Sequence, residues 1–426
     1  MPSRRLAHVV VVNDTLHVNG GAAQVALTSA VGLRERGHRV TVFGAVEPIA
    51  PELQAAGVDV VSLEQRTILD DANRGRAMAQ GIWNGDAYRR MRAFLFGCDP
   101  GETVVHVHGW AKSLSSSVVR AAEEAGFPVV VTLHDYLSVC PNGSFFDHPA
   151  QAICRRTPMS FACVTRNCDS RSAVHKAWRV ARHATQDRVG HMPSSVRHFI
   201  AVSAFSEAVL APLLPHGRPI TVVPNPIDVA RGVPTDPALH TSFAYVGRLS
   251  SEKGVVLFAQ AARDAGVPAL FIGSGDVRPQ IEAANPLATF TGWLDRAASH
   301  ARLRAARALV LPSLWYETYG LVVAEAAAAG VPAIVPTTSA ARDLIVDGVT
   351  GTLFAGGDRA ALAAALARYA DDARVRAHGR AAYERYWANP ATMDRHLDGL
   401  AEVYASVAAV APARMFAVPR VAEQRA

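Results

Sequence analysis

Four charged side chains in two short segments have the types and spacing needed for chemistry on a polyanion. Glu317 and Glu325 are separated by seven residues, and Arg248 and Lys253 lie upstream in Gly247-Arg-Leu-Ser-Ser-Glu-Lys-Gly254. Carboxylates accept hydrogen bonds from hydroxyl groups, and fixed cations stabilise the negative charge that develops on a departing phosphate. Together these residues indicate a pocket for a sugar joined to a nucleoside diphosphate.

The acidic pair lies in a predicted strand, loop, helix and strand. Ala308 to Leu311 is an apolar run typical of a buried parallel strand, and the Ala-rich segment after it has Gly320 at its start and Gly330 at its end. Glycine suits the end of a helix, and the helix N-terminus presents free N–H groups that bind diphosphate. Glu317 falls in the loop and Glu325 about one and a half turns inside the helix, so we expect both to face one ligand.

The two motifs together resemble those of retaining glycosyltransferases of the GT-B type, in the large family 4 that is also described as glycosyl transferases group 1. Matching features run in the family's order from Gly20 to Tyr404, so the resemblance covers nearly the whole chain. It implies an α/β fold of two Rossmann-like, doubly wound domains that face each other across a cleft. It also implies a C-terminal helix that crosses back onto the first domain.

The resemblance gives each matching residue a role. Arg248 and Lys253 would contact the donor diphosphate, together with backbone N–H groups of the turn Tyr319-Gly320-Leu321. Glu317 would be a catalytic residue that holds hydroxyl groups of the donor sugar, and Glu325 would hold the ribose. Taken singly, a surface Arg and Lys, a loop acid and one exposed helical Glu would also explain these residues.

Two glycine-containing loops are expected to border the ligand. Gly20 and Gly21 follow the first predicted strand, and family members use this loop to approach the acceptor and the donor phosphate closely. Gly292 and Trp293 resemble the loop beside the nucleobase. A tight turn explains these glycines equally well, and Val-Asn-Gly-Gly is not the dinucleotide-binding fingerprint.

Three histidines follow or lie in predicted strands of the first half. His134 comes directly after the strand Pro128 to Leu133, at the edge that would face the cleft. An imidazole there can donate a hydrogen bond to the sugar, so we predict a catalytic role for His134; the alternative is a loop cap. His106 and His108 share one strand face, and we expect them to line the cleft rather than bind a metal, because no third ligand accompanies them.

Four of the five cysteines, Cys140, Cys154, Cys163 and Cys168, fall within 29 residues. Their intervals of 13, 8 and 4 residues match no common zinc finger, and a reducing cytoplasm disfavours disulfides. Either a structural zinc site or unpaired thiols would explain them. Some family members carry a similar insertion here, which implies a loop that shapes the acceptor site.

Basic residues recur at helical spacings in residues 171–183, together with Trp178. This pattern suits contact with an anionic acceptor or a membrane, and a solvated helix face fits it as well. Over the whole chain the net charge is +6 and the basic residues look scattered, which argues against nucleic acid as a partner. An anionic membrane surface that carries a lipid-linked acceptor remains an open alternative.

The length of 426 residues suits two domains, and half of the residues are apolar, as in globular proteins. We expect an acceptor-side domain over residues 1–228, a donor domain over 229–389, and a tail over 390–426 that packs on the first domain. No apolar run reaches the length of a membrane span, and the opening residues are interpreted as a strand rather than a signal peptide. The expected location is the cytoplasm, with the inner face of the membrane as an alternative.

The predicted function is retaining transfer of a hexose from a UDP or GDP sugar to a glycan or lipid-linked acceptor, in cell-surface polysaccharide or glycolipid synthesis. The resemblance implies that catalysis needs no cofactor, because cations and N–H groups replace a metal. Two other functions would use the same donor pocket: a nucleotide-sugar epimerase of similar fold, and a sugar-nucleotide binding protein without activity.

Overall fold

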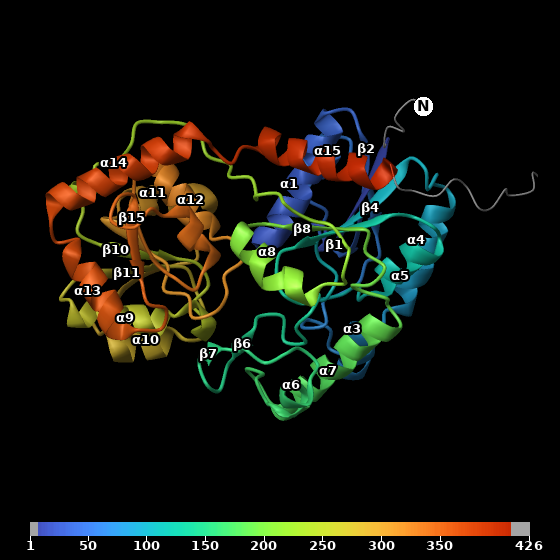
Figure 1. The fold of residues 1–426 in the computed structure, drawn as a ribbon, viewed down its shortest axis with the longest axis horizontal. Coiled ribbons are helices and arrows are strands. Elements are labelled where there is room, and N and C mark those ends of the chain that lie inside the picture. Colours follow the sequence, from blue (N-terminus) through green and yellow to red (C-terminus); the bar gives the residue numbers. More distant parts are fainter. Residues whose placement is uncertain (1–6, 410–426) are drawn as a thin grey trace, which may run out of the picture.

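The computed structural model describes residues 7–409, which form two α/β domains, each built on one parallel sheet (Figure 1). In spatial order the first sheet contains β3 (Asp59–Ser62), β2 (Arg39–Val46), β1 (His8–Thr15), β4 (Thr103–Val107), β5 (Val129–Leu133), β8 (His198–Ala201) and β9 (Ile220–Val222). The second sheet contains β12 (Thr289–Gly292), β11 (Ala269–Ile272), β10 (Phe243–Val246), β13 (Ala308–Val310), β14 (Ala333–Pro336) and β15 (Gly351–Phe354).

Helices cover both faces of each sheet. Those of the first half are α1 (Gly21–Glu35), α2 (Pro51–Ala55), α3 (Arg74–Ile82), α4 (Gly85–Phe96), α5 (Ser117–Glu124), α6 (Phe161–Thr165), α7 (Ala173–Arg188) and α8 (Ala204–Leu210). Those of the second half are α9 (Val255–Asp264), α10 (Arg278–Ala284), α11 (Arg296–Arg304), α12 (Leu321–Ala329), α13 (Arg359–Arg368), α14 (Asp372–Ala388) and α15 (Met393–Ala409). A short hairpin of β6 (Phe146–Asp147) and β7 (Ala152–Ile153) stands apart from the two sheets.

Continuous apolar runs form the central strands because parallel strands are buried on both faces. Val9 to Val12 of β1 are fully buried, with clusters of apolar side chains on each side of the sheet. The predicted first strand is therefore confirmed, and it extends to Thr15. The doubly wound α/β fold with two facing domains is confirmed as well.

The strand, loop, helix and strand around the acidic pair form as predicted. β13 leads through a loop into α12, whose two ends are glycines in left-handed backbone, Gly320 with φ 94° and Gly330 with φ 81°. A Cβ on Gly320 would lie 2.7 Å from the Cβ of Ala341, so both the backbone angle and the space at this position require glycine. The helix then returns the chain to β14.

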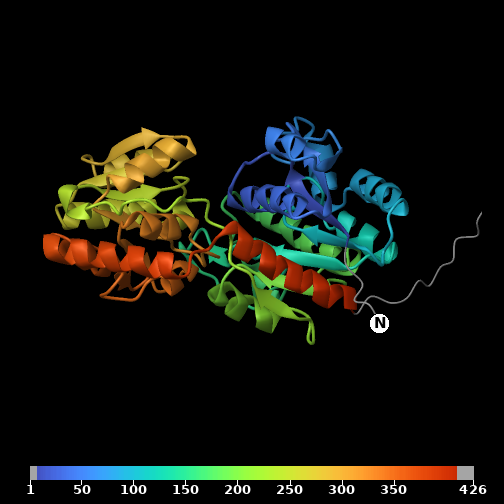
Figure 2. The same cartoon turned by 90° about the horizontal axis from the view of Figure 1, so that it is seen from above.

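The C-terminal helices divide between the domains (Figure 2). α14 packs on the second domain, and α15 crosses back over the first, where Leu397, Leu400 and Val403 join the apolar cluster under β1. The predicted crossing helix is thus present. The last strand of the first sheet ends at Val222 and the second sheet begins at Phe243, which is compatible with the proposed boundary near residue 228. The part of the predicted tail beyond Ala409 lies outside the described residues.

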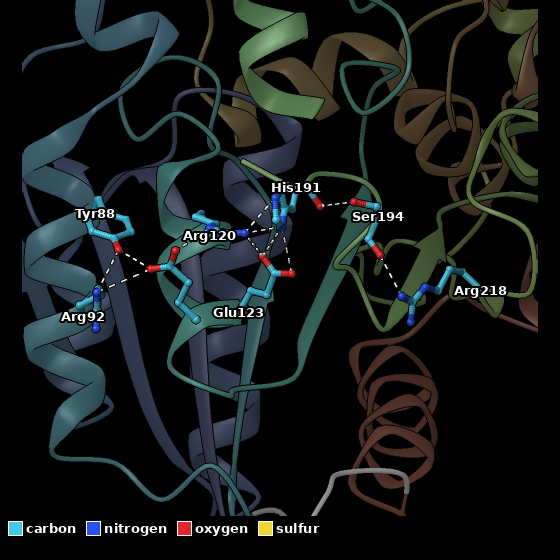
Figure 3. Close-up of polar contacts among 8 residues, drawn as sticks. Tyr88, Arg92, Arg120, Glu123, His191, Ser194 and Arg218 are labelled. Carbon is cyan, nitrogen blue, oxygen red and sulfur yellow. Dashed lines mark hydrogen bonds and ion pairs between the residues drawn. The ribbon is translucent and has the colours of Figure 1, made fainter. Parts of the chain in front are cut away.

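A hollow of about 640 Å³ lies at the amino-terminal edge of the first sheet, before β5, β8 and β9. The charged groups beside it bind one another (Figure 3): Arg120 pairs with Glu124 at 2.7 Å and His191 with Glu123 at 3.0 Å. Arg218 donates a hydrogen bond to the carbonyl of Ser194 at 2.9 Å. The first pair lies within α5 and the second joins α5 to the loop before β8, whereas ligands of doubly wound sheets bind at the opposite, carboxyl edge.

α7 has one exposed face and one buried face, and several of its basic residues lie on the buried face. Lys176, Arg182 and His183 are buried, and Arg179 forms an ion pair of 2.5 Å with the buried Asp169. Burial lowers the pKa of Arg182 to about 10, because the charged form loses water. Among residues 7–409, no helix is both long and apolar enough to cross a membrane.

We predict that Tyr404→Phe weakens the attachment of α15. The Tyr404 hydroxyl lies 2.6 Å from Nδ1 of the buried His106, and its removal leaves that nitrogen without this partner. The expected loss is about 1–3 kcal/mol in the free energy of unfolding, measured by urea denaturation. Tyr383→Phe is the control, because its hydrogen bond to the carbonyl of Gly232 is exposed and its loss should cost about 0.5 kcal/mol or less. Equal losses in the two variants would contradict the role of the Tyr404 hydroxyl in attaching α15.

Candidate active site

Lys253 and Glu317 form an ion pair at the carboxyl edge of the second sheet. Lys253 Nζ lies 2.8 Å and 3.0 Å from the two carboxylate oxygens, and both side chains are mostly buried. The Ser313 hydroxyl and the Trp315 indole N–H also donate to Glu317, each at 3.1 Å. The Lys253 ammonium is 5.0 Å from the centre of the Trp315 ring. Glu317 is therefore held in one orientation by donors from three side chains.

A close backbone approach brings Lys253 to this position. Gly254 has φ 68°, and a Cβ there would lie 2.0 Å from the carbonyl oxygen of Pro312. The Leu314 N–H also donates to the carbonyl of Glu252 at 2.9 Å. Any side chain at residue 254 would push the two loops apart, so the glycine that ends the basic motif is a requirement of the ion pair.

Arg248 reaches into solvent beside this pair. Its side chain is 72% exposed and its guanidinium contacts Glu252 at 2.9 Å. Glu252 is mostly buried and accepts a hydrogen bond from the Ser250 hydroxyl at 2.6 Å, and hydrogen bonds and nearby cations lower its pKa although burial acts against them. Among the described residues this ion pair is the one side-chain contact of the exposed guanidinium, and its contact with a diphosphate stays a prediction.

The N-terminus of α12 faces the first domain. Tyr319 is buried, whereas Gly320 and Leu321 begin the helix, whose first N–H groups have no helical partner. From the first domain, the Gly20-Gly21 loop meets this helix end: a Cβ on Gly21 would lie 3.1 Å from the Leu321 side chain. The structure thus brings the predicted phosphate turn and the predicted glycine loop together across the cleft.

Two hydrogen bonds join the Glu317 loop to the first domain. The Thr318 hydroxyl donates to the backbone carbonyl of His134 at 3.0 Å, and the Ser203 hydroxyl donates to the carbonyl of Thr318 at 2.7 Å. His134 and Glu317, predicted from segments far apart in the sequence, therefore lie on two loops in direct contact.

The imidazole of His134 is held by a second histidine. Its Nε2 lies 3.0 Å from Nδ1 of His108, and both rings line a hollow of about 110 Å³ at the carboxyl edge of the first sheet. Burial lowers the pKa of His134 to about 3 and that of His108 well below the usual value. His134 is therefore neutral near pH 7, which suits hydrogen bonding to a sugar rather than proton donation by a cation.

The prediction that both histidines of β4 line the cleft is right for one of them. His108 lines the hollow, whereas His106 is a core residue between Tyr404 and Thr132, with hydrogen-bond distances of 2.6 Å and 2.7 Å. The two rings do share a face, with centres 4.1 Å apart. Because the strand ends at Val107, only the second histidine projects beyond the sheet.

Two carboxyl groups line the same hollow. Asp14 accepts hydrogen bonds from three backbone N–H groups of residues 112–114, at 2.8–3.0 Å, so it fixes that turn. Asp135 accepts one N–H bond, from Leu137, and burial raises its pKa to about 6. Asp135, Lys112 and His134 are among the polar residues that line this hollow.

Glu325 lies in a separate hollow of about 190 Å³ against α11. Its carboxylate is 3.3 Å from His300 and 4.0 Å from Arg296. The structure places it inside α12, as predicted, but it does not contact the Lys253–Glu317 pair. A ribose-binding role for Glu325 stays a prediction.

The predicted nucleobase loop follows β12. Gly292 has φ 72° and bridges to Gly273, and Trp293 is 77% exposed. An exposed indole with no ring contact among the described residues is available for stacking, and its role stays a prediction.

The structure does not gather the four cysteines into a group of possible metal ligands, and a zinc site there stays a prediction. None of the four thiols is in a disulfide, and within residues 7–409 no group of three or more possible ligands is placed to hold a metal ion. The buried ammonium of Lys176 lies 3.7 Å from the Cys163 sulfur and also interacts with Cys168. A fixed cation among the thiols opposes a second one by charge repulsion.

Family models match both halves of the chain. Residues 19–231 match the model described as Glycosyltransferase Family 4, and residues 240–372 match the model described as Glycosyl transferases group 1. The chain belongs to glycosyltransferase family 4. This family assignment agrees with the two motifs, which lie in the second matched region.

Two curated relatives span most of this family 4 glycosyltransferase. Glycogen synthase of Mycobacterium tuberculosis is 29% identical, with 80% of this chain and 85% of the relative covered. Phosphatidyl-myo-inositol mannosyltransferase of Mycolicibacterium smegmatis is 26% identical, with 84% and 83% covered. A sucrose-phosphate synthase of Thermosynechococcus elongatus has the same GT-B fold, with a TM-score of 0.68, 17% identity, and coverage of 94% of this chain and 99% of that one.

Several site residues were not foreseen. Ser313 and Trp315 orient Glu317, and Thr318 joins the two domains. The signal for the first two is their position four and two residues before Glu317, where a tight loop turns neighbouring side chains inward. No sequence signal identifies Thr318, because its partner lies in the other domain.

We predict that His134 makes the stability of the glycosyltransferase depend on pH. Its pKa is about 3 in the folded protein and about 6.5 unfolded. Between these values the unfolded chain binds a proton that the folded chain does not, so stability is full above about pH 6.5 and falls below it, by up to about 1.4 kcal/mol per pH unit. The stability difference between wild type and His134→Asn should shrink between about pH 7.5 and pH 4.5 in urea denaturation.

The matched control is His216→Asn, at an exposed position. Its stability difference from wild type should stay constant over the same range. A constant difference for His134→Asn as well would show that His134 is not held neutral.

Proposed function

We propose that the protein is a retaining glycosyltransferase that moves a hexose from a UDP or GDP sugar to a hydroxyl group of a glycan or lipid-linked acceptor. The observation that carries this proposal is the Lys253–Glu317 pair, at 2.8 Å, on a loop that binds the His134 loop of the facing domain. On this proposal, groups that would bind a diphosphate and a sugar face groups that would bind an acceptor.

The donor side supplies charge stabilisation from the protein itself. Lys253, Arg248 and the free N–H groups at the start of α12 would face the diphosphate, whose negative charge grows as it departs. Glu317 would accept hydrogen bonds from sugar hydroxyls, because it is an oriented acceptor. On this proposal no metal cofactor is required.

Retention requires the acceptor oxygen to take the place of the departing phosphate on the same face of the sugar. The bond from the anomeric carbon to the phosphate oxygen breaks, and the bond to the acceptor oxygen forms. The acceptor proton passes to an oxygen of the leaving diphosphate. Neutral His134 would donate a hydrogen bond to the sugar, and domain closure would exclude water.

The relatives support a hexose donor and indicate which nucleotide sugar to test first. A GDP-mannose-dependent alpha-mannosyltransferase of Mycolicibacterium smegmatis is 37% identical over 109 residues, or 26% of this chain. Phosphatidyl-myo-inositol mannosyltransferase acts on a lipid by name. We therefore propose polysaccharide or glycolipid synthesis at the cytoplasmic side of a membrane, and GDP-mannose is the first donor to test.

We predict that one nucleoside diphosphate raises the melting temperature. A ligand at one hundred times its Kd adds about 2.7 kcal/mol, which at about 2–4 °C per kcal/mol is about 5–11 °C for a domain of this size. Scanning fluorimetry with UDP, GDP and their glucose and mannose derivatives would identify the base. If none of the nucleotides raised the melting temperature, the proposal that this site binds a nucleoside diphosphate would be contradicted.

Glycosyl transfer from the binding donor then tests the reaction. Conversion of the donor sugar without an acceptor would indicate the epimerase, and donor binding without any product would indicate a binding protein. Retention is read from the anomeric configuration of the product by NMR, and an inverted product would contradict the proposed stereochemistry.

We predict that Glu317→Gln lowers transfer by at least about 100-fold, because the charge that orients Lys253 and accepts sugar hydroxyls is lost. The shape of the side chain is kept, so circular dichroism should not change. Glu282→Gln is the control, since this exposed residue pairs only with Arg278 on α10 among the described residues. Activity of Glu317→Gln within a few-fold of wild type would contradict the proposed role of Glu317.

A further inference from the structure

We infer that residues 147–188, here called the cysteine lobe, form a docking surface for an anionic lipid bilayer. The lobe contains β7, α6 and α7 and projects beside the gap between the domains (Figure 1). This inference rests on the proposed function, because a lipid-linked acceptor would require the enzyme to reach a membrane.

The cysteine lobe carries most of the excess positive charge. It contains eight arginine and lysine residues and three aspartates, a net charge of +5, whereas the whole chain has +6. The basic residues are therefore not evenly scattered once acidic residues are counted with them, which corrects the expectation from the sequence. Such a concentration favours a surface that carries negative charge.

Part of this charge is available at the surface. Asp147 contacts both Arg156 and Arg166, at 3.3 Å and 2.7 Å, so one carboxylate faces two cations. Arg155 and Arg171 are exposed, and neither side chain has a hydrogen bond or ion pair among the described residues. These two cations can approach lipid phosphates without first breaking an internal contact.

Large apolar side chains project from the same lobe. Phe161 is 85% exposed, Val174 71% and Val164 40%. Phe161 and Val164 are three residues apart and so share one side of α6. Cys163, between them, turns inward to Lys176 of α7, at 3.7 Å. Burial on that side leaves the apolar side of α6 and the start of α7 facing outward.

The segment that leads into the cysteine lobe contacts the Glu317 loop. The rings of Tyr136 and Phe145 lie 6.3 Å and 6.4 Å from the ring of Tyr316, the residue before Glu317. A bilayer bound by the outer end of the lobe would therefore lie near the entrance to the cleft. A lipid-linked acceptor could then enter without leaving the membrane.

A bilayer fits these features better than a protein partner. Apolar side chains that insert at the headgroup boundary and cations that bind anionic lipids act together, and neither signal alone gives stable binding. The exposed groups stand on a short helix and a helix start, which can insert between lipids.

The experiment is sedimentation of the full-length protein with vesicles. We expect binding to mixed phosphatidylglycerol and phosphatidylcholine vesicles, and at least tenfold weaker binding to phosphatidylcholine alone. Binding should fall when salt rises from about 0.1 M to about 0.5 M. The double variants Phe161→Ser/Val174→Ser and Arg155→Gln/Arg171→Gln should each bind at least tenfold more weakly.

Matched variants control for exposure and charge. Phe96→Ser/Leu287→Ser removes two side chains that are each 86% exposed, and Arg90→Gln/Arg302→Gln removes two exposed cations outside the lobe. Both should bind vesicles like wild type. Equal losses in lobe and control variants would overturn the inference, as would wild-type protein that ignores anionic vesicles or binds neutral ones equally.

A water-soluble acceptor separates this inference from the proposed function. Lobe variants should keep the thermal shift with nucleotide and transfer to that acceptor, because the substituted side chains lie outside the site. Vesicle binding without any transfer would contradict the proposed function and support the lobe. Transfer without vesicle binding would support the proposed function and contradict membrane docking by the lobe.

Discussion

The ion pair between Lys253 and Glu317 is the contact on which the site depends. Taking two charges out of water is costly, and the attraction between them repays this only when further hydrogen bonds satisfy them. Glu317 has two such donors, from Ser313 and Trp315, each at 3.1 Å. The pair also needs the backbone contact at Gly254, so the glycine and the two charges form one structural unit.

This unit is attached to the facing domain. Thr318, next to Glu317, donates to the carbonyl of His134, and the Ser203 hydroxyl donates to the carbonyl of Thr318. The His134 ring is in turn fixed by His108. The centre of the His108 ring lies 4.1 Å from that of the buried His106, which is bonded to Tyr404 of α15. The crossing helix thus supports the acceptor side of the cleft from behind.

The sequence predicts those features of the fold that depend on residues close together in the chain. The apolar run of β13 and the glycines at both ends of α12 are local signals, so this unit and its Glu317 could be placed in advance. β3 and β15 were not foreseen: in β3 the side chains are half-exposed or exposed, and β15 is Gly-Thr-Leu-Phe, with only two apolar side chains. Such strands lack a long apolar run.

Contacts between distant segments could not be predicted. Thr318 and His134 are 184 residues apart, and their hydrogen bond uses a backbone carbonyl, which leaves no trace in residue type. Glu325 was expected beside the donor groups, but α11 supplies His300 and Arg296 to it instead. The burial of Lys176 beside thiols also follows from packing that residue type alone does not reveal.

The Lys253 ammonium has enough N–H groups for the ion pair to bind both the phosphate and the sugar of a nucleotide sugar. An ammonium has three N–H groups, and two of them reach the oxygens of Glu317, at 2.8 Å and 3.0 Å. The third can bind a phosphate oxygen while the pair stays intact. Glu317 keeps lone pairs for sugar hydroxyls, because a carboxylate has about four acceptor positions. A nucleotide that carries its sugar would satisfy both groups at once, which would favour the complete donor over the free diphosphate.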